Sequence, residues 1–141
     1  DTPVYSKEFI QKNFPNSQIK SVEEDDDEYG VRLNTGESLE FDMEGNFEEA
    51  KFKRGLPSSI LPKTAADYIT LTYPSVNIVK IELKRNHYEG RFVYTKFRPD
   101  INEVLAHIDI FMGTVLSIVI GFSQGGVKAQ QSLINAMAEF E

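Results

Sequence analysis

Apolar and polar side chains follow two different periods along this chain of 141 residues. In two stretches apolar side chains recur every three to four positions, which is typical of a helix with one buried side. In most of the remainder they recur at every second position, which is typical of a strand with one face in water. Tyr29, Val31 and Leu33, for example, alternate with Gly30 and Arg32. The pattern predicts an α+β fold with antiparallel strands.

The helical pattern predicts one helix at Val4–Asn13 and another at Ser58–Thr72. Pro15 follows the first and Pro74 the second, and proline disfavours helical backbone at the residue before it. Pro62 lies within the second predicted helix and is compatible only with its start.

The alternating pattern predicts two antiparallel meanders, in which hairpin turns join neighbouring strands. NTGE at 34–37 and MEGN at 43–46 are turn sequences of the first meander. In the second meander a hairpin is predicted within His107–Ile120, around Met112–Thr114. The other predicted strands are Gln18–Glu23, Tyr29–Leu33, Ser38–Asp42, Phe47–Phe52, Val76–Leu83 and Tyr88–Lys96.

The chain contains an internal repeat. FIQKNFPNSQIKSVE (9–23) aligns without a gap with YITLTYPSVNIVKIE (68–82), and the same offset of 59 residues continues to Arg32 and Arg91. The fold is therefore predicted as a tandem repeat of a helix plus a four-strand antiparallel meander. We divide the chain into a first repeat (1–54), a diverged second repeat (55–122) with about eight extra residues at its middle turn, and a C-terminal segment (123–141) with a helix at Val127–Phe140.

Charge is concentrated in the first repeat. The net charge of the chain is −7, and residues 1–54 account for it with 14 acidic and 7 basic side chains. An acidic chain without a basic stripe argues against nucleic acid and anionic membranes as partners. The absence of cysteine excludes disulfides and thiolate metal sites. The longest apolar run, 108–122, is interrupted by polar residues and is too short to span a bilayer.

The chain begins at Asp1 without a methionine, so we expect either a trimmed chain or a mature form, in which any signal peptide or lipid-anchor cysteine would belong to the missing upstream part.

Several of these segments together resemble the PepSY-like family of small secreted proteins of Gram-negative bacteria. They are FIQKNFP (9–15), IKSVE (19–23), YGVRL (29–33) and TGESLEFDMEGNFEEA (35–50) in the first repeat, and LPKTAADYITLTYP (61–74), IVKIE (78–82) and HYEGRF (87–92) in the second. The resemblance implies a fold comparable with that of the beta-lactamase inhibitor protein, a periplasmic or outer-surface location and no enzymatic role. It assigns no functional residue.

The acidic run Glu23–Glu28 has three interpretations. Consecutive like charges are usually solvated, which favours a hairpin turn in water. A docking patch and a Ca²⁺ site remain alternatives, although the run lacks the spacing of an EF-hand loop. The second repeat carries KIELKRNHYE (80–89) at this place, where basic residues replace the acidic ones. The fold therefore needs the hairpin and not its negative charge.

Candidate catalytic and metal-binding groups are sparse. His107 and Asp109 are two residues apart and share one face of a strand, but a metal site needs a third converging group. The neighbouring sequence provides none, so we expect His87 and His107 to be surface or turn residues and predict no metal or cofactor. No nucleophile elbow or phosphate-binding loop is present either.

The outward faces of the two predicted sheets are the surface that we expect to carry function. The outward positions include Arg32 in the first repeat and Arg91, Val93 and Phe97 in the second. Arginine beside exposed apolar groups is favoured in protein interfaces. Alternatively, both arginines only form cross-strand pairs, with Glu40 for example, each worth a fraction of a kilocalorie per mole.

We therefore expect a non-catalytic extracytoplasmic module that binds a protein or peptide ligand, as an inhibitor or an envelope interaction protein. The alternative is a small-ligand or cation sensor that uses Glu23–Glu28.

Overall fold

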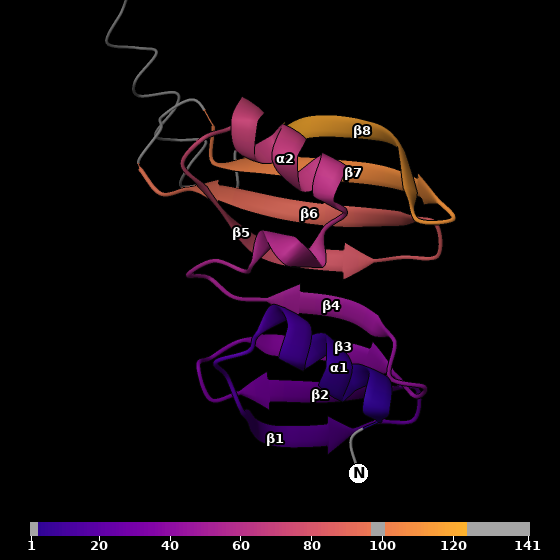
Figure 1. Cartoon of the computed structure of the whole chain (residues 1–141). Coiled ribbons are helices and arrows are strands. Elements are labelled where there is room, and N and C mark those ends of the chain that lie inside the picture. The colour runs from indigo at the N-terminus through magenta and orange to yellow at the C-terminus, as the bar shows by residue number, and fades with distance from the viewer. Residues whose placement is uncertain (1–2, 97–100, 124–141) are drawn as a thin grey trace, which may run out of the picture.

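The computed structural model describes residues 3–96 and 101–123. Eight strands form one antiparallel sheet whose spatial order is the order of the chain, and both α-helices lie on the same face of it (Figure 1). The strands are β1 (Ile19–Glu24), β2 (Glu28–Leu33), β3 (Ser38–Asp42), β4 (Phe47–Lys51), β5 (Val76–Leu83), β6 (His87–Tyr94), β7 (Glu103–Phe111) and β8 (Thr114–Ser123). The predicted C-terminal helix at Val127–Phe140 lies outside the described residues.

Helix α1 (Val4–Asn13) packs on the first four strands through aromatic side chains. The ring of Phe9 stacks on Phe47, with centroids 4.5 Å apart, and meets the buried Phe41 edge-on at 5.5 Å. The helix ends where predicted, because Pro15 forces the residue before it out of helical backbone. Phe14 leaves the helix there and is buried in the core.

The second predicted helix starts later than expected. The segment Ser58–Ile60 forms a 3₁₀ turn, η1, and helix α2 spans Lys63–Thr72. Leu61 between them is extended, with ψ of 156°, because the residue before a proline avoids the helical region. Pro62 therefore caps α2 and is not part of its first turn.

The two meanders join into one sheet, whereas the sequence pattern suggested two. Strand β4 pairs with β5, and Glu49, Ala50 and Lys51 lie opposite Glu82, Ile81 and Lys80. Ala50 and Ile81 are fully buried, so the hydrophobic core runs without interruption under both helices. The joined sheet leaves its opposite side as one continuous surface.

The extra residues of the second repeat lengthen the hairpin between β6 and β7. The connection grows from four residues (34–37) to eight (95–102), and each flanking strand continues for two residues more at that end. The following β7–β8 hairpin turns at Met112 and Gly113 as predicted. Both have positive φ, 49° and 80°, which is the geometry of a two-residue hairpin turn.

Candidate binding face on the open side of the sheet

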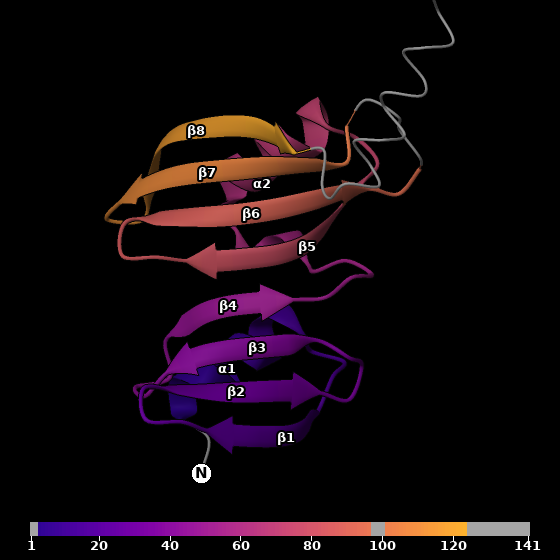
Figure 2. The same cartoon turned by 180° about the vertical axis from the view of Figure 1, so that it is seen from behind.

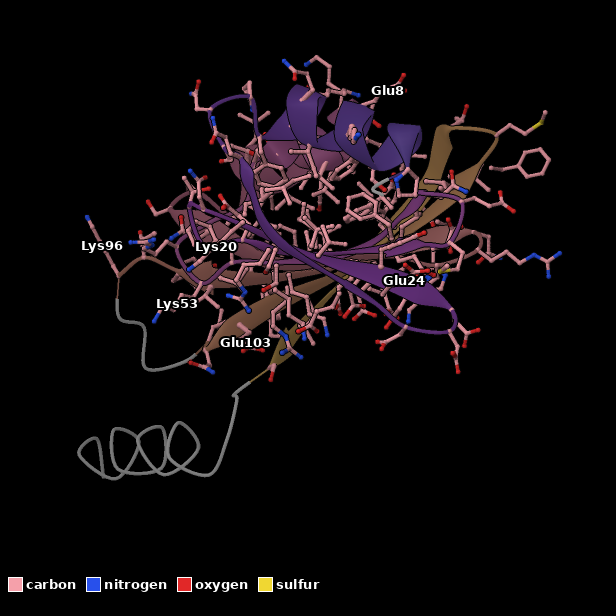
Figure 3. All side chains as sticks on the ribbon, turned by 90° about the horizontal axis from the view of Figure 1, so that it is seen from below. Glu8, Lys20, Glu24, Lys53, Lys96 and Glu103 are labelled. Atoms are coloured by element: carbon pink, nitrogen blue, oxygen red, sulfur yellow. The ribbon has the colours of Figure 1, made fainter. Side chains whose placement is uncertain are left out.

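Among the described residues, no helix covers the face of the sheet that lies opposite α1 and α2 (Figure 2). We call it the open face. In Figure 3 the sheet separates Glu8 on α1 from Glu103, which lies on the open side. Strand side chains alternate between faces, so on β6 Glu89 and Arg91 point to the open face while Gly90 and Phe92 are buried.

The strand register lines up charges of one sign across this face. One line of directly opposed positions contains Arg32, Ser38, Lys51, Lys80 and Arg91, and we call its four basic residues the cationic row. The adjacent line contains the acidic residues Glu23, Glu40, Glu49, Glu82 and Glu89, which we call the acidic row. Like charges directly opposite each other destabilise a sheet.

Ion pairs of the acidic row with Lys80 of the cationic row, and with Lys84 outside it, offset this repulsion at the centre of the sheet. The Nζ atom of Lys80 lies 3.4 Å from Glu49 and 3.0 Å from Glu82, and Lys84 lies 3.0 Å from Glu82. The hydrogen bond to Glu82 raises the pKa of Lys80 above its ordinary value. Burial acts to raise the pKa of Glu82, but the hydrogen bonds and charges of the two lysines bring it below its ordinary value.

A hollow of about 350 Å³ opens between β5 and β8 on this face. Its apolar lining comes from Leu105 and Val119, and Gly121 leaves it open because no side chain fills that position. Arg91 stands at its edge and pairs with Glu103, Nε to Oε2, at 3.2 Å. The hollow is therefore an apolar depression whose lining also includes charges of both signs, Lys80 and Arg91 with Glu82 and Glu89.

A broader groove adjoins it where the two repeats meet. The groove measures about 840 Å³, and its basic residues are Lys51, Lys53, Arg54, Lys80 and Arg91. Two of the basic side chains are more exposed than the carboxylates they pair with: Lys51 is 56% exposed and Arg91 48%, against 15% for Glu49 and 20% for Glu103, whereas Lys80 is 27% exposed. The groove therefore presents positive charge, although the chain as a whole is acidic.

The predicted binding residues are spread unevenly over the face. Arg91 lies where the hollow and the groove meet, whereas Arg32 lies at a separate small hollow of the first repeat, about 200 Å³ in volume. Val93 is half-buried and lines neither the 350 Å³ hollow nor the groove. Phe97 lies outside the described residues. Arg91 forms a cross-strand pair, as the alternative interpretation expects, but its partner is Glu103 on β7 and not Glu40.

The sequence interpretation missed two features of this face. Leu105 could have been found by alternation along β7. Lys51, Lys53 and Arg54 could not, because they come beside Arg91 only through the pairing of β4 with β5.

The acidic run forms a tight solvent-exposed turn. Residues 25–27 join β1 to β2, and the Asp25 amide donates a hydrogen bond to the Glu28 carbonyl at 2.9 Å. The matching turn in the second repeat has the same bond, from Lys84 to His87 at 2.8 Å. Two turns of opposite charge thus have one backbone geometry, as the alignment of the repeats predicted.

The family profile described as "Putative beta-lactamase-inhibitor-like, PepSY-like" matches the chain twice, over residues 3–49 and 48–93. The chain belongs to the PepSY-like family. The two matches correspond to the two repeats, so they confirm the resemblance and support the duplication. PepSY-like is not a known enzyme family, and no curated protein matches the chain.

Three solved structures of Bacteroides proteins have a similar fold. A "putative calcium-regulated periplasmic protein" from Bacteroides thetaiotaomicron is 27% identical, with a TM-score of 0.65 over 84% of this PepSY-like chain and 91% of that chain. A periplasmic protein of unknown function from Bacteroides vulgatus is 27% identical, with a TM-score of 0.64 over 84% and 92%. A periplasmic protein of the DUF2874 family from the same species is 25% identical, with a TM-score of 0.61 over 83% and 89%.

These similarities confirm the expected periplasmic or outer-surface location in a Gram-negative bacterium. Neither described α-helix has the length and apolar character needed to cross a bilayer.

Proposed function

We propose that this PepSY-like protein is a non-catalytic periplasmic binding module whose open face holds an acidic segment of a protein or peptide. The observation that carries the proposal is the cationic row beside the apolar hollow. Lys51, Lys80 and Arg91 oppose one another on three adjacent strands, and the side chains of Lys51 and Arg91 stay about half exposed although each lies beside a carboxylate, so a negative ligand can reach them. Either an inhibitor or an envelope interaction protein could bind its partner through such a face.

Geometry favours an extended ligand. Neighbouring strands lie roughly 4.8 Å apart, so the basic side chains of the groove follow one another at short intervals across β4, β5 and β6. Beyond Arg91 the same line continues to Leu105 and Gly121 in the hollow. A segment with carboxylates followed by an apolar side chain matches this order, since charge pairs set its register and apolar burial adds affinity.

Peptide display on the immobilised chain tests the proposal. We expect the enriched peptides to combine Asp or Glu with an apolar residue, and to bind less tightly as salt concentration rises. Arg91→Glu is expected to weaken their binding about tenfold or more, which corresponds to about 1.4 kcal/mol. The matched control is Arg85→Glu, because Arg85 is exposed in the β5–β6 turn and lies outside the cationic row.

Equal weakening by both substitutions would attribute the effect to net charge, and binding indifferent to Arg91→Glu would remove the open face from the proposal. Crosslinking of a captured envelope protein at residue 91 or 105 then identifies the natural ligand.

A cation sensor that uses Glu23–Glu28 is the second candidate. It is supported by the description of the similar Bacteroides thetaiotaomicron protein as calcium-regulated. Extracellular Ca²⁺ modules bind at roughly 0.1–1 mM. Calorimetry with Ca²⁺ in that range, on the chain and on the Asp25→Asn/Asp27→Asn variant, tests it. Binding heat in the unaltered chain that the double substitution abolishes would support the sensor. The absence of binding heat in the unaltered chain would exclude it.

A further inference from the structure

Two histidines lie side by side on the open face, on the part of β6 and β7 nearest the β5–β6 turn. Strand β6 carries His87 and Glu89, and β7 carries His107 and Asp109. The register places His87 opposite Asp109 and Glu89 opposite His107. The two imidazole rings stack with centroids 4.1 Å apart and 20° between their planes. The third converging group that is missing from the sequence around His107 therefore comes from the neighbouring strand.

His87, Glu89 and His107 form a compact set of potential metal ligands. Each offers a ligand atom within 4.8 Å of the other two, and no other group of three or more His, Asp or Glu side chains in the described ranges 3–96 and 101–123 does so. Ligand atoms about 2.0–2.2 Å from one Zn²⁺ ion lie roughly 3–4 Å apart. To share one ion the three atoms must approach one another, and the two stacked rings must tilt from their near-parallel planes, because an imidazole holds an ion in the plane of its ring.

Hydrogen bonds hold His107 as a metal-binding histidine is usually held. Its Nε2 lies 3.0 Å from Oδ1 of Asp109, and Ser117 donates a 2.9 Å hydrogen bond to Oδ2 of the same carboxylate. Because an ionised carboxylate can only accept, Nε2 carries a proton, and in the neutral imidazole Nδ1 is then the nitrogen with the free lone pair. A carboxylate that receives the other ring N–H is the usual partner of a metal-bound imidazole.

His87 is oriented in a similar way. Its Nδ1 lies 3.1 Å from the side-chain oxygen of Asn86, so this nitrogen donates, and in the neutral imidazole Nε2 is the nitrogen with the free lone pair. The Nε2 atom faces Oε1 of Glu89 at 3.5 Å. In the neutral imidazole both facing atoms are acceptors, so a cation between them, either a metal ion or a proton on Nε2, stabilises the arrangement.

We propose that His87, Glu89 and His107 bind a divalent transition-metal ion, with Asp109 as the positioning residue for His107. Two imidazoles and one carboxylate suit Zn²⁺ and the neighbouring first-row metals, whereas Ca²⁺ takes six to eight oxygen ligands. Three protein ligands leave a coordination position for water or for a ligand group at the surface. Glu89 and His107 also line the hollow beside Arg91, so that position adjoins the proposed binding face.

Comparison of the repeats indicates that the fold does not require these histidines. In the first repeat the same pairing places Glu28 opposite Asp42 and Gly30 opposite Glu40. Asp42 thus corresponds to Asp109. Glu28 stands at the position of His87, and Glu40 stands at the position of His107. Both strand pairs form with the same register, so the ligand set is a feature of the second repeat alone.

Isothermal titration of the full 141-residue chain with Zn²⁺ tests the proposal. We expect one ion per chain, with affinity reduced roughly a hundredfold or more in His87→Ala and in His107→Ala, and at least tenfold in Glu89→Gln. Loss of a residue that hydrogen-bonds to a metal ligand typically lowers metal affinity 10–100-fold. Asp109→Asn is therefore expected to lower zinc affinity within that range, while the urea midpoint of unfolding stays unchanged. Glu40→Gln is the matched control for Glu89→Gln and is expected to bind Zn²⁺ like the unaltered chain.

The proposal fails if the unaltered chain takes up no zinc, or if the double variant His87→Ala/His107→Ala binds zinc as tightly as the unaltered chain. Circular dichroism of each variant separates lost binding from lost folding. These outcomes are independent of the peptide proposal, because Arg91→Glu is expected to leave zinc affinity within about twofold of its original value.

Discussion

The second repeat fills one part of its core with Gly90 and Phe92, where the first repeat uses Val31 and Leu33. All four positions are buried and correspond through the offset of the repeats. A Cβ atom added to Gly90 would meet Cε2 and Cζ of the Phe92 ring at 2.8 and 2.9 Å, which is closer than real Cβ contacts. The large ring of Phe92 therefore occupies the space that a side chain at position 90 would need.

Introducing valine at position 90 is expected to destabilise the protein. Overpacking of a dense core typically costs 1–3 kcal/mol, and the gain of about 1 kcal/mol from replacing a strand glycine offsets only part of it. Phe92→Leu alone leaves unfilled volume and is expected to cost about 2 kcal/mol. Together, Gly90→Val and Phe92→Leu recreate the pair of the first repeat. The double variant is expected to be within about 1 kcal/mol of the unaltered protein.

Urea unfolding of the four proteins measures this coupling. The free energy of unfolding of the double variant should exceed the additive expectation by roughly 2 kcal/mol or more, at an unchanged denaturant slope. Phe92→Leu in the presence of Gly90 serves as the control for lost ring volume. Additive effects, within about 0.5 kcal/mol, would refute the idea that the two positions exchange volume.

Three further substitutions test local features. Asp42 accepts hydrogen bonds from the amide and side chain of Asn46, and these bonds outweigh the effect of burial and lower the pKa of Asp42. Asp42→Ala should therefore reduce the free energy of unfolding by about 1 kcal/mol near neutral pH. In urea titrations this difference should disappear as the pH falls through the lowered pKa. Burial and the charge of Glu49 raise the pKa of Glu40 above 4.5, so Glu40→Gln should raise the melting temperature at pH 7 and have no effect well below pH 4.5. Ser75 has a positive φ of 69°, a backbone conformation that glycine adopts more easily. Ser75→Gly should therefore raise the free energy of unfolding in urea by up to about 1 kcal/mol, and a lower free energy of unfolding would contradict this.

Local sequence features predicted most of the elements well, because their causes lie within a few residues. Alternation located β3 and β5 to the residue, and proline ended α1 and α2 where expected. The start of α2 was missed for a local reason as well, since Pro62 competes with an apolar pattern that continues on both sides of it. The outward position of Arg91 followed from alternation alone.

The environment of Arg91 could not be predicted in this way. Its neighbours Lys51 and Lys80 come from different repeats, and only the pairing of β4 with β5 aligns them. The same holds for His87 and His107, whose contact depends on the register of β6 and β7 after the lengthened hairpin. Alternation fixes the face on which a side chain lies, but which residue of the next strand lies opposite it also depends on the geometry of the connection and on the packing of the common core.

The sequence by itself determined the repeat, the meanders, the two described α-helices and the side of each strand that faces water, because periodicity and turn chemistry are local. Only the tertiary structure decided that two meanders form one sheet, that like charges run in rows across it, and that two histidines meet beside a glutamate. The physical reason is that a strand selects its own faces, whereas its neighbours are selected by the free energy of burying the common core.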